Sequence, residues 1–237
     1  MHGAVLVAGG SSRRMEEQVK DKLLHPILDT TAFRMSFEAF YKSDKISCII
    51  VVYRDSEQKL HLESECNTVL KKDNSHLAPY FVQGGKERYN SVTNGLLALP
   101  KECSFIHVHD CARPLIKSTT IDQMAKEVES VGAIVACRPV VDTIRENIEP
   151  KLPFDYPKKT RTLNRTLLWR METPQVCRKE WLEKGLMKAK EKNILITDEI
   201  ATLELIGKKT AFHIPEYANP KITTIKDIRY IEFLLQK

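Results

Sequence analysis

The residues that follow the first apolar run of the chain carry groups suited to binding phosphate. Ala4–Ala8 reads as a short buried strand, and Gly9–Met15 follows it with two glycines, two serines and two arginines. A small-residue turn after a strand lets the backbone approach a ligand, so that its free N–H groups can cradle phosphate oxygens. Arg14 and Lys22 add fixed positive charge. The spacing matches neither GxxxxGK[ST] nor GxGxxG, which indicates a phosphate-binding turn of another kind.

A second turn with paired glycines is suited to a nucleobase or a sugar. Gly84 and Gly85 follow a predicted strand, Pro79–Val82. Without side chains they let a flat ring lie against the backbone, whose N–H and C=O groups can read its edge. Ser91 comes three residues after Arg88, so the two share one face of the predicted helix. A simple turn between strand and helix is the alternative interpretation of this segment.

A carboxylate stands where a third strand is predicted to end. Asp110 directly follows the predicted strand Phe105–His109. Mg²⁺ takes only one or two protein carboxylates when phosphates and water complete its octahedron, so Asp110 is a candidate magnesium ligand. Arg113 could support a sugar or phosphates, and Pro114 stiffens the turn. The alternative is an aspartate that only caps the turn.

The other metal-ligating residue types suggest structural roles. His107 and His109 share a strand face, but the sequence offers no further ligands for a zinc site near them. The six cysteines contain no CxxC pair and fall partly in apolar runs, which predicts reduced thiols rather than a disulfide framework.

The last third of the chain carries further polar groups. Thr143 follows an apolar run, and Arg165 lies beyond a proline-containing stretch. Thr173 and Thr197 each stand in a polar step before a helical pattern, and Thr197 is also a natural N-cap candidate. Lys221 is an isolated cation in a short extended segment before the final helix. A second phosphate-bearing substrate would need such donors, apart from those that serve the first.

Alternating strands and helices must position these groups. Strands are expected at Val5–Ala8, Ile46–Tyr53, Pro79–Val82, Phe105–His109, Ala133–Cys137 and Thr210–Ile214. Helices are expected at Thr31–Lys42, Ser56–Ser64, Arg88–Leu99, Thr119–Ser130, Lys179–Lys190, Asp198–Ile206 and Ile225–Leu235. This alternation predicts an α/β fold with a mostly parallel sheet and helices on both faces. Ligands bind at the carboxyl ends of such strands, so the three turns should meet at one edge of the sheet.

One region breaks the alternation. Thr143–Arg165 contains three prolines and several cations, has no helical period and has little core material. It is predicted to be an excursion loop or a protruding hairpin arm. No second independent domain is apparent, and 237 residues are enough for one large α/β domain.

Composition narrows the class of protein. A hydrophobic content of 42% supports a packed core, and no apolar run approaches the ~20 residues of a membrane span. The net charge is +6, but no basic block is interleaved with aromatic residues, so an anionic small molecule is a better expected partner than nucleic acid. The first strand begins close to Met1, from which we expect no leader peptide and a cytoplasmic protein.

Taken in order, these segments resemble the 2-C-methyl-D-erythritol 4-phosphate cytidylyltransferase family of the non-mevalonate isoprenoid pathway. The resemblance runs nearly end to end and rests on Ala8–Met15, Gly84–Val92, His109–Pro114, Pro139–Ile144, Asn164–Trp169, Thr173–Gln175, Thr197–Glu199 and Asn219–Thr224. It implies a Rossmann-like sheet in one nucleotidyltransferase domain over residues 1–237, with a β-arm at about 143–165 that joins a homodimer. It also implies CMP transfer from CTP to methylerythritol phosphate with release of pyrophosphate.

The resemblance further implies a role for each matching residue. The residues expected to contact the nucleotide are Ala8, Gly9, Gly10, Ser12, Gly85, Lys86, Arg88, Ser91, Ala112 and Arg113. The cations expected to serve catalysis are Arg14, Lys22 and Lys221, and Asp110 is expected to bind Mg²⁺. The residues expected to hold methylerythritol phosphate are Thr143, Arg165, Thr173 and Thr197, the first two reaching it through the arm of the other subunit.

The expected chemistry is direct in-line attack by the phosphate oxygen of the acceptor on the α-phosphorus of CTP. A phosphate monoester is already an ionised nucleophile, so the protein supplies positioning and positive charge rather than a covalent group. Two alternatives stay open from the sequence. One is a ribitol-5-phosphate cytidylyltransferase with the same CTP site, and the other is a non-catalytic nucleotide-binding protein of the same fold.

Overall fold

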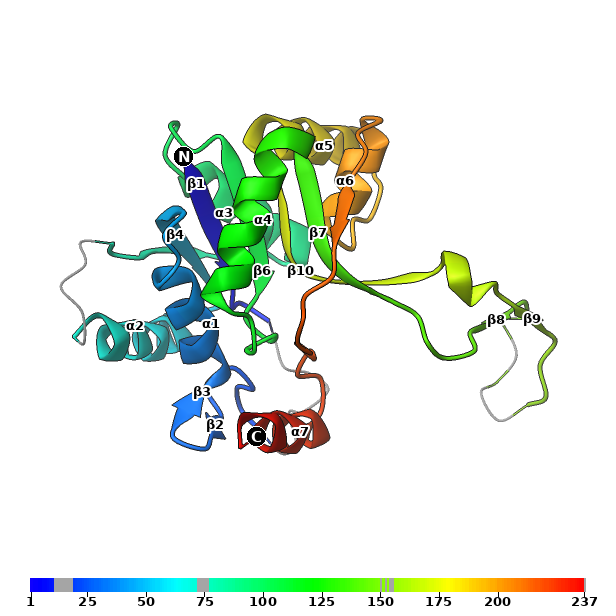
Figure 1. Cartoon of the computed structure of the whole chain (residues 1–237), viewed down its shortest axis with the longest axis horizontal. Helices are drawn as coiled ribbons and strands as arrows, with labels where there is room; N and C mark the ends of the chain where they lie inside the picture. Colours follow the sequence, from blue (N-terminus) through cyan, green and yellow to red (C-terminus); the bar gives the residue numbers. More distant parts are fainter. Residues whose placement is uncertain (11–18, 72–76, 150, 152, 154–155, 237) are drawn as a thin grey trace.

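The computed structural model describes residues 1–10, 19–71, 77–149, 151, 153 and 156–236. Within these residues a seven-stranded sheet has the order β11-β7-β10-β6-β1-β4-β5 (Figure 1). Its strands are β1 (His2–Val7), β4 (Ile46–Tyr53), β5 (Tyr80–Gln83), β6 (Phe105–Asp110), β7 (Ala133–Pro139), β10 (Trp169–Arg178) and β11 (Ala211–His213). β10 runs antiparallel to β6 and β7, and the other pairs are parallel. The predicted mostly parallel sheet is confirmed.

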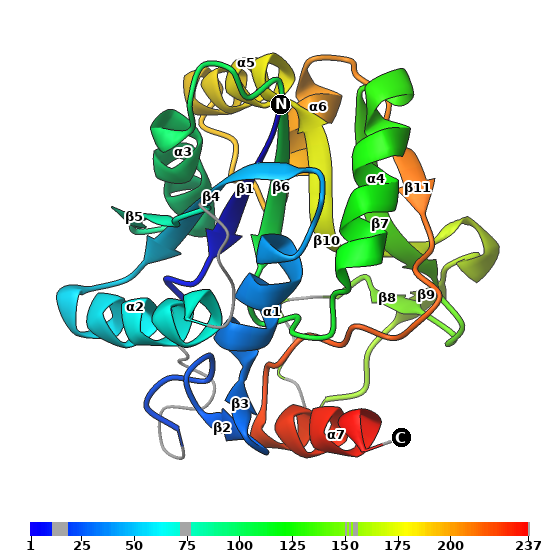
Figure 2. The ribbon, with the colours of Figure 1, turned by 60° about the vertical axis from the view of Figure 1, so that its left-hand side comes forward.

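Helices cover both faces of this sheet, as predicted. They are α1 (Ala32–Tyr41), α2 (Ser56–Leu70), α3 (Arg88–Ala98), α4 (Ser118–Val131), α5 (Lys179–Glu191), α6 (Glu199–Leu205) and α7 (Ile225–Leu235). Side chains alternate between faces along β1. Leu6 packs in a core with Phe33 of α1 and Leu62 of α2, whereas Val5 packs with Leu96 of α3 and Leu203 of α6. Figure 2 shows α1 and α4 side by side on the first of these faces.

Local signals in the sequence set the ends of several helices. The Thr31 hydroxyl accepts the N–H of Arg34 at the start of α1, and the Asp55 carboxylate accepts the N–H of Gln58 at the start of α2. Gly132 closes α4 with a φ of +82°, a conformation that disfavours a side chain. These caps fix where the loops at the edge of the sheet begin and end.

An arm leaves the sheet between β7 and β10 (Figure 1). It contains the antiparallel strands β8 (Arg145–Asn147) and β9 (Thr160–Thr162), followed by the short helix η1 (Arg165–Leu167). Of the two predicted alternatives, the structure therefore selects a protruding hairpin. Val141 and Leu167, at the root of the arm, are each 75% exposed. Such a hairpin has few neighbours of its own chain, and isolated two-stranded hairpins are only marginally stable in water.

Two other expectations about elements were wrong or incomplete. Thr173–Gln175 was predicted as a polar step before a helix, but it lies inside β10. The error arises because this central strand buries the polar side chains of Glu172, Thr173 and Gln175, which hides the apolar pattern of a strand. The sequence reading also missed a small hairpin of β2 (Pro26–Ile27) and β3 (Thr30–Thr31).

No helix in the described part of the chain is both long enough and apolar enough to span a membrane. The same residues include all six cysteines, each of which is a buried free thiol. The predicted absence of disulfides is therefore confirmed in the structure.

Candidate active site

A pocket of about 420 Å³ opens at the edge of the sheet where β1 and β6 end. Its lining comes from the turns after β1, β4, β5 and β6 and from a segment near the start of α7. The three turns that the sequence analysis placed at one edge thus meet there. The lining residues are Val7, Gly9, Gly10, Lys22, Leu23, Arg54, Gly85, Lys86, Glu87, Arg88, Ser91, Asp110, Ala112 and Lys221.

The predicted site residues fall into three groups. Those that line the pocket are Gly9, Gly10, Lys22, Gly85, Lys86, Arg88, Ser91, Asp110, Ala112 and Lys221. Those that lie elsewhere are Ala8, Arg113, Thr143, Arg165, Thr173 and Thr197. Ser12 and Arg14 lie outside the described residues. The structure therefore brings most of the described candidates together, while the role of each remains a prediction.

Alternating charges run from the wall of the pocket to the buried Glu199 behind it. The Lys221 ammonium lies 2.5 Å from Oδ2 of Asp110, and Nε of Arg88 donates to Oδ1 of Asp110 at 3.0 Å. The two terminal nitrogens of Arg88 donate to the two oxygens of Glu199, at 2.7 and 3.2 Å. Four residues distant in sequence thus form one chain of ion pairs. The side chains of Glu199 and Asp110 are only 3% and 12% exposed, so little water screens these pairs.

Burial and the two neighbouring cations, Arg88 and Lys221, shift the pKa of Asp110 in opposite directions. Burial alone would raise the pKa of this carboxyl, but Arg88 and Lys221 outweigh it and hold the pKa below its usual range. Asp110 therefore stays ionised at neutral pH. Burial raises the pKa of Glu199, and the charge of Arg88 opposes that shift without reversing it.

A hydrogen bond from the backbone of Asp110 also holds this residue in place, on the side away from the pocket. Its N–H donates to the Thr173 hydroxyl at 3.2 Å, and that hydroxyl lies 3.1 Å from Nδ1 of His109. Burial lowers the pKa of His109 to about 3, so the ring is neutral. Its Nε2 must donate to the Arg113 carbonyl, 3.2 Å away, because a carbonyl only accepts. Nδ1 then accepts from Thr173, which gives Thr173 a supporting place behind the pocket.

Lys221 reaches the pocket because its segment is bonded to the turn after β6. The Ile222 N–H donates to the Ala112 carbonyl at 2.8 Å, and Nη1 of Arg113 donates to the Asn219 carbonyl at 3.1 Å. Lys22 joins the same segment, since its ammonium donates to the Ile222 carbonyl at 2.9 Å. Arg113 thus has a bracing contact in this structure. The segment holds Lys22 and Lys221 at one side of the pocket.

The glycine turn after β5 approaches its neighbours closely. A Cβ on Gly85 would lie 2.3 Å from the Cβ of Asn90, so no side chain fits there. The Gly85 N–H donates to the Ser91 hydroxyl at 3.1 Å. Glu87 and Asn90 form a capping box that starts α3 and sets the direction of Arg88.

The remaining substrate candidates lie away from this pocket. Thr143 and Arg165 are exposed on the arm, where the Arg165 guanidinium donates to the Val141 carbonyl. Thr197 is exposed. The prediction that Thr197 could be the N-cap of the next helix is wrong. The cap is Asp198, whose carboxylate accepts the N–H of Ala201 at 3.0 Å, because the helix begins one residue later than Thr197 would require.

Sequence reasoning missed two side chains of this site. Arg54 lines the pocket directly after β4, so the rule that drew attention to other strand ends could have found it. Glu199 was noted only as part of a polar step, because nothing local indicates its partner Arg88. Gln175 orients the start of α6, since its Oε1 accepts the N–H groups of Glu199 and Ile200 at 2.9 and 3.1 Å.

The described residues offer one place for a divalent cation at this pocket. They contain no group of three or more His, Cys, Asp or Glu side chains arranged to hold a metal. Asp110 is ionised, lines the pocket and retains lone pairs beyond its two ion pairs. One carboxylate suits Mg²⁺ that is held mainly by phosphate and water.

Comparisons with known proteins agree over the full chain. A family model described as 2-C-methyl-D-erythritol 4-phosphate cytidylyltransferase matches residues 2–237. The protein of that name from Caldanaerobacter subterraneus is 34% identical over 234 residues, which cover 99% of this chain and 98% of that protein. The one from Desulforamulus reducens is 32% identical over 234 residues, covering 99% of this chain and 95% of that protein.

Solved structures are similar in fold. The 4-diphosphocytidyl-2C-methyl-D-erythritol synthase of Anaerococcus prevotii has a TM-score of 0.80 at 21% identity, covering 100% of this chain and 96% of that chain. The 2-C-methyl-D-erythritol 4-phosphate cytidylyltransferase of Thermus thermophilus has a TM-score of 0.76 at 21% identity, covering all of both chains. With the full-length family match, these observations show that the chain belongs to the 2-C-methyl-D-erythritol 4-phosphate cytidylyltransferase family.

Proposed function

We propose that this chain transfers CMP from CTP to 2-C-methyl-D-erythritol 4-phosphate and releases pyrophosphate. The observation that carries the proposal is the pocket at the sheet edge, where Lys22, Lys221, Arg88 and Asp110 meet in a chain that matches the family over its whole length. Both substrates are polyanions, and the pocket concentrates cations around one buried carboxylate. This arrangement suits a reaction in which negative charge must be brought together.

The proposed step is in-line attack of the acceptor's phosphate oxygen on the α-phosphorus of CTP. Lys22 and Lys221 lie on the same side of the pocket and would neutralise the two phosphate-bearing substrates. Arg88 is held between Asp110 and Glu199, so its main task would be to keep Asp110 ionised and oriented. No protein nucleophile is required, because the acceptor phosphate is already charged.

Mg²⁺ is the proposed cofactor, with Asp110 as its protein ligand. When bound, the cation would offset the negative charge of the triphosphate as pyrophosphate departs. Asp110 fits this part because its carboxyl stays ionised and lines the pocket.

The glycine turn after β5 is the proposed site of the cytosine and ribose. Gly85 leaves backbone free of side chain at the pocket wall, and Ser91 holds that backbone in place. Gly9, Gly10 and Ala112 complete the wall on which the nucleotide would lie.

A homodimer would supply the remaining acceptor contacts. Thr143 and Arg165 belong to the segment between β7 and β10, which forms the protruding arm (Figure 1), and neither lines the pocket of its own chain. The exposed Val141 and Leu167 give the arm apolar surface to bury against a second copy. The arm of each subunit would then complete the pocket of the other. The six free thiols support a reducing compartment, which we propose to be the cytoplasm.

The direct test measures pyrophosphate release with CTP and Mg²⁺, using methylerythritol 4-phosphate or ribitol 5-phosphate as the acceptor. Release only with methylerythritol 4-phosphate is expected. Release only with ribitol 5-phosphate would keep the CTP site and replace the acceptor. Binding of CTP without release in either assay would favour a non-catalytic nucleotide-binding protein.

A further inference from the structure

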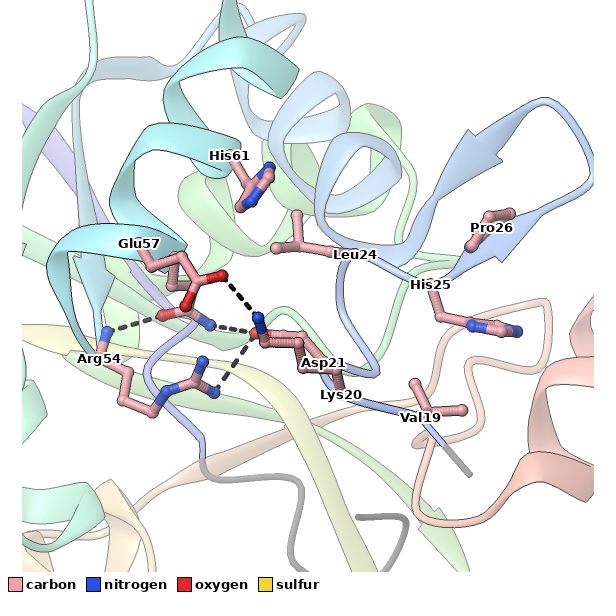
Figure 3. A pocket seen from close by; sticks show the side chains of 10 residues that line it. Val19, Lys20, Asp21, Leu24, His25, Pro26, Arg54, Glu57 and His61 are labelled. Carbon is pink, nitrogen blue, oxygen red and sulfur yellow. Dashed lines mark hydrogen bonds and ion pairs between the residues drawn. The ribbon is translucent and has the colours of Figure 1, made fainter. Parts of the chain in front are cut away.

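Three side chains that were not predicted as site residues form a mostly buried polar cluster in contact with Ala8 and Gly10, directly after β1. We call Asp21, Arg54 and Gln58 the Asp21 cluster. The side chain of Asp21 is 8% exposed, that of Arg54 is 30% exposed, and Gln58 is 1% exposed. Figure 3 shows the Arg54 guanidinium directed at Asp21 on the wall of a separate pocket of about 300 Å³. Arg54 lines this pocket and also the nucleotide pocket.

Gln58 is the centre of the cluster. Its amide nitrogen donates to the Ala8 carbonyl at 3.0 Å and to Oδ2 of Asp21 at 2.7 Å. Its amide oxygen accepts the backbone N–H of Arg54 at 2.7 Å. One buried side chain therefore joins the segments after β1 and β4 to the segment that contains Asp21.

Asp21 and Arg54 extend these bonds to the residues that face the pocket. Oδ1 of Asp21 accepts the N–H of Leu23 at 2.9 Å, so the carboxylate spans Lys22. The Arg54 guanidinium lies 3.4 Å from Oδ2 of Asp21 and donates to the Gly10 carbonyl at 3.3 Å. The backbone on both sides of Lys22, and the backbone at Ala8 and Gly10, are thus held by one set of contacts.

We propose that the Asp21 cluster positions Lys22 and the start of the glycine turn for the triphosphate. The three residues are positioning residues, since they act through Lys22, Ala8 and Gly10. The inference rests on the proposed function and deepens it by assigning these residues to the phosphate end of CTP. Within the described residues, the side chains of the cluster contact the turns after β1 and β4 and do not contact Gly85 or Ser91 at the proposed base site; only the Arg54 backbone carbonyl accepts from Gln83, at the end of β5.

A positioning role and a general stabilising role differ in which part of the nucleotide binds more weakly when the cluster is lost. Loss of the cluster should weaken binding of the phosphates more than binding of the base and ribose. Inorganic pyrophosphate with Mg²⁺ probes the phosphate end alone, and CMP probes the base end with one phosphate. Misplacement of a binding group by about 1 Å can cost on the order of 10²-fold, so the difference between the two probes should be measurable.

Gln58→Met is the main variant because methionine has a similar length and no hydrogen-bond donor. Asp21→Asn is the second variant, since it keeps an acceptor for the Leu23 N–H but removes the charge that faces Arg54. Glu57→Gln is the matched control, because Glu57 is next to Gln58 on α2 and forms an ion pair with exposed Lys20 at the surface. Circular dichroism and thermal melting establish that each full-length variant is folded.

We expect Gln58→Met and Asp21→Asn to weaken pyrophosphate binding by ~10-fold or more in calorimetry, with CMP binding unchanged. The KM for CTP should rise while the KM for the acceptor stays unchanged, and Glu57→Gln should match the wild type. Equal weakening of pyrophosphate and CMP, or no change in either in a folded variant, would overturn the inference. Wild-type pyrophosphate release from CTP tests the proposed function separately, so the two failures are distinguishable.

Discussion

Arg88 contacts both oxygens of Glu199 and also turns Nε toward Asp110 at 3.0 Å. Its guanidinium thus joins a carboxylate at the end of β6 to one at the start of α6. Glu199 does not line the pocket. It holds the Arg88 side chain, and Arg88 in turn orients Asp110. The orientation of the pocket's carboxylate therefore depends on a residue on a helix far along the chain.

Replacement of Glu199 by glutamine should destabilise the protein. The variant leaves Arg88, which is mostly buried, facing a neutral group, and an imperfectly paired buried group costs about 1–3 kcal/mol. Urea denaturation should show this fall in the free energy of unfolding. Glu204→Gln on the exposed side of the same helix is the control and should change little. Equal stability of the two variants would show that Glu199 does not support Arg88.

Lys22→Ala and Lys221→Ala should each reduce turnover by ~10²–10³, because each removes a charged donor from the pocket that we propose binds the phosphates. Turnover is measured as pyrophosphate release with both substrates saturating, and circular dichroism reports the fold. Lys20→Ala is the control, since Lys20 is 81% exposed and pairs with Glu57 at the surface. Near-normal turnover in either pocket variant would remove that lysine from the proposed mechanism.

Removal of divalent cations should abolish turnover. The proposed site has one protein carboxylate, so the cation should be held mainly by CTP and lost readily to a chelator. EDTA-treated protein should release no pyrophosphate until Mg²⁺ is added back, with its melting temperature unchanged throughout. Full turnover in the chelator would exclude a metal from the step.

The proposed arm exchange predicts complementation between two inactive variants. Lys22→Ala damages the pocket, and Arg165→Ala damages the arm. If each arm serves the partner's pocket, a mixed dimer has one intact site and one doubly damaged site. Co-expression of the two variants should then restore about a quarter of the wild-type turnover by this symmetry argument. If the arm served its own pocket, co-expression would restore nothing.

Stability should fall as the solution becomes mildly acidic. His2, His107 and His109 are buried, and burial lowers the pKa of each from 6.5, that of His109 to about 3. Below pH 6.5 these histidines become protonated in the unfolded chain but stay neutral in the folded chain, because their pKa values are lower there. For each histidine, the free energy of unfolding therefore falls by up to about 1.4 kcal/mol for each pH unit below 6.5. The full stability is present only above pH 6.5.

A variant isolates this effect from other titrating groups. In His107→Gln, one buried histidine is absent, so the loss of stability between pH 6.5 and pH 5 should be shallower than in the wild type. Urea denaturation at several pH values gives both slopes. Parallel slopes would mean that His107 takes up its proton equally in both states.

The sequence predicted those parts of the fold whose pattern is local. The strands β1, β5 and β6 were predicted from local runs of residues, and the turns after them were predicted to meet at one edge of the sheet, where the pocket lies. β10 was not predicted from the sequence, because Glu172, Thr173 and Gln175 are polar yet buried in a central strand. Their partners, among them His109 and Glu199, lie elsewhere in the chain, so only the tertiary structure shows why polar groups are tolerated there.

The candidate site divides in the same way. Glycines, Asp110 and Lys221 were identified from residue type and place in the chain. Gln58 and Glu199 were not, because each acts through a partner that a linear pattern does not reveal. Whether Thr143–Arg165 was a loop or a hairpin also depended on strand pairing across an insertion, which spacing alone does not fix.

The contact of Lys221 with Asp110 also sets an order of events during synthesis. Gly10 leaves the ribosome 211 residues before Lys221, an interval of roughly 10–40 s at typical elongation rates. Asp110 is synthesised 111 residues before Lys221, and until Lys221 is added Asp110 lacks one of its two cations and the Ala112 carbonyl lacks the Ile222 N–H. A nascent chain halted before Lys221 would carry most of the residues that line the pocket without the cation that pairs with Asp110. The charge balance of the pocket is thus completed only after Lys221 has been synthesised.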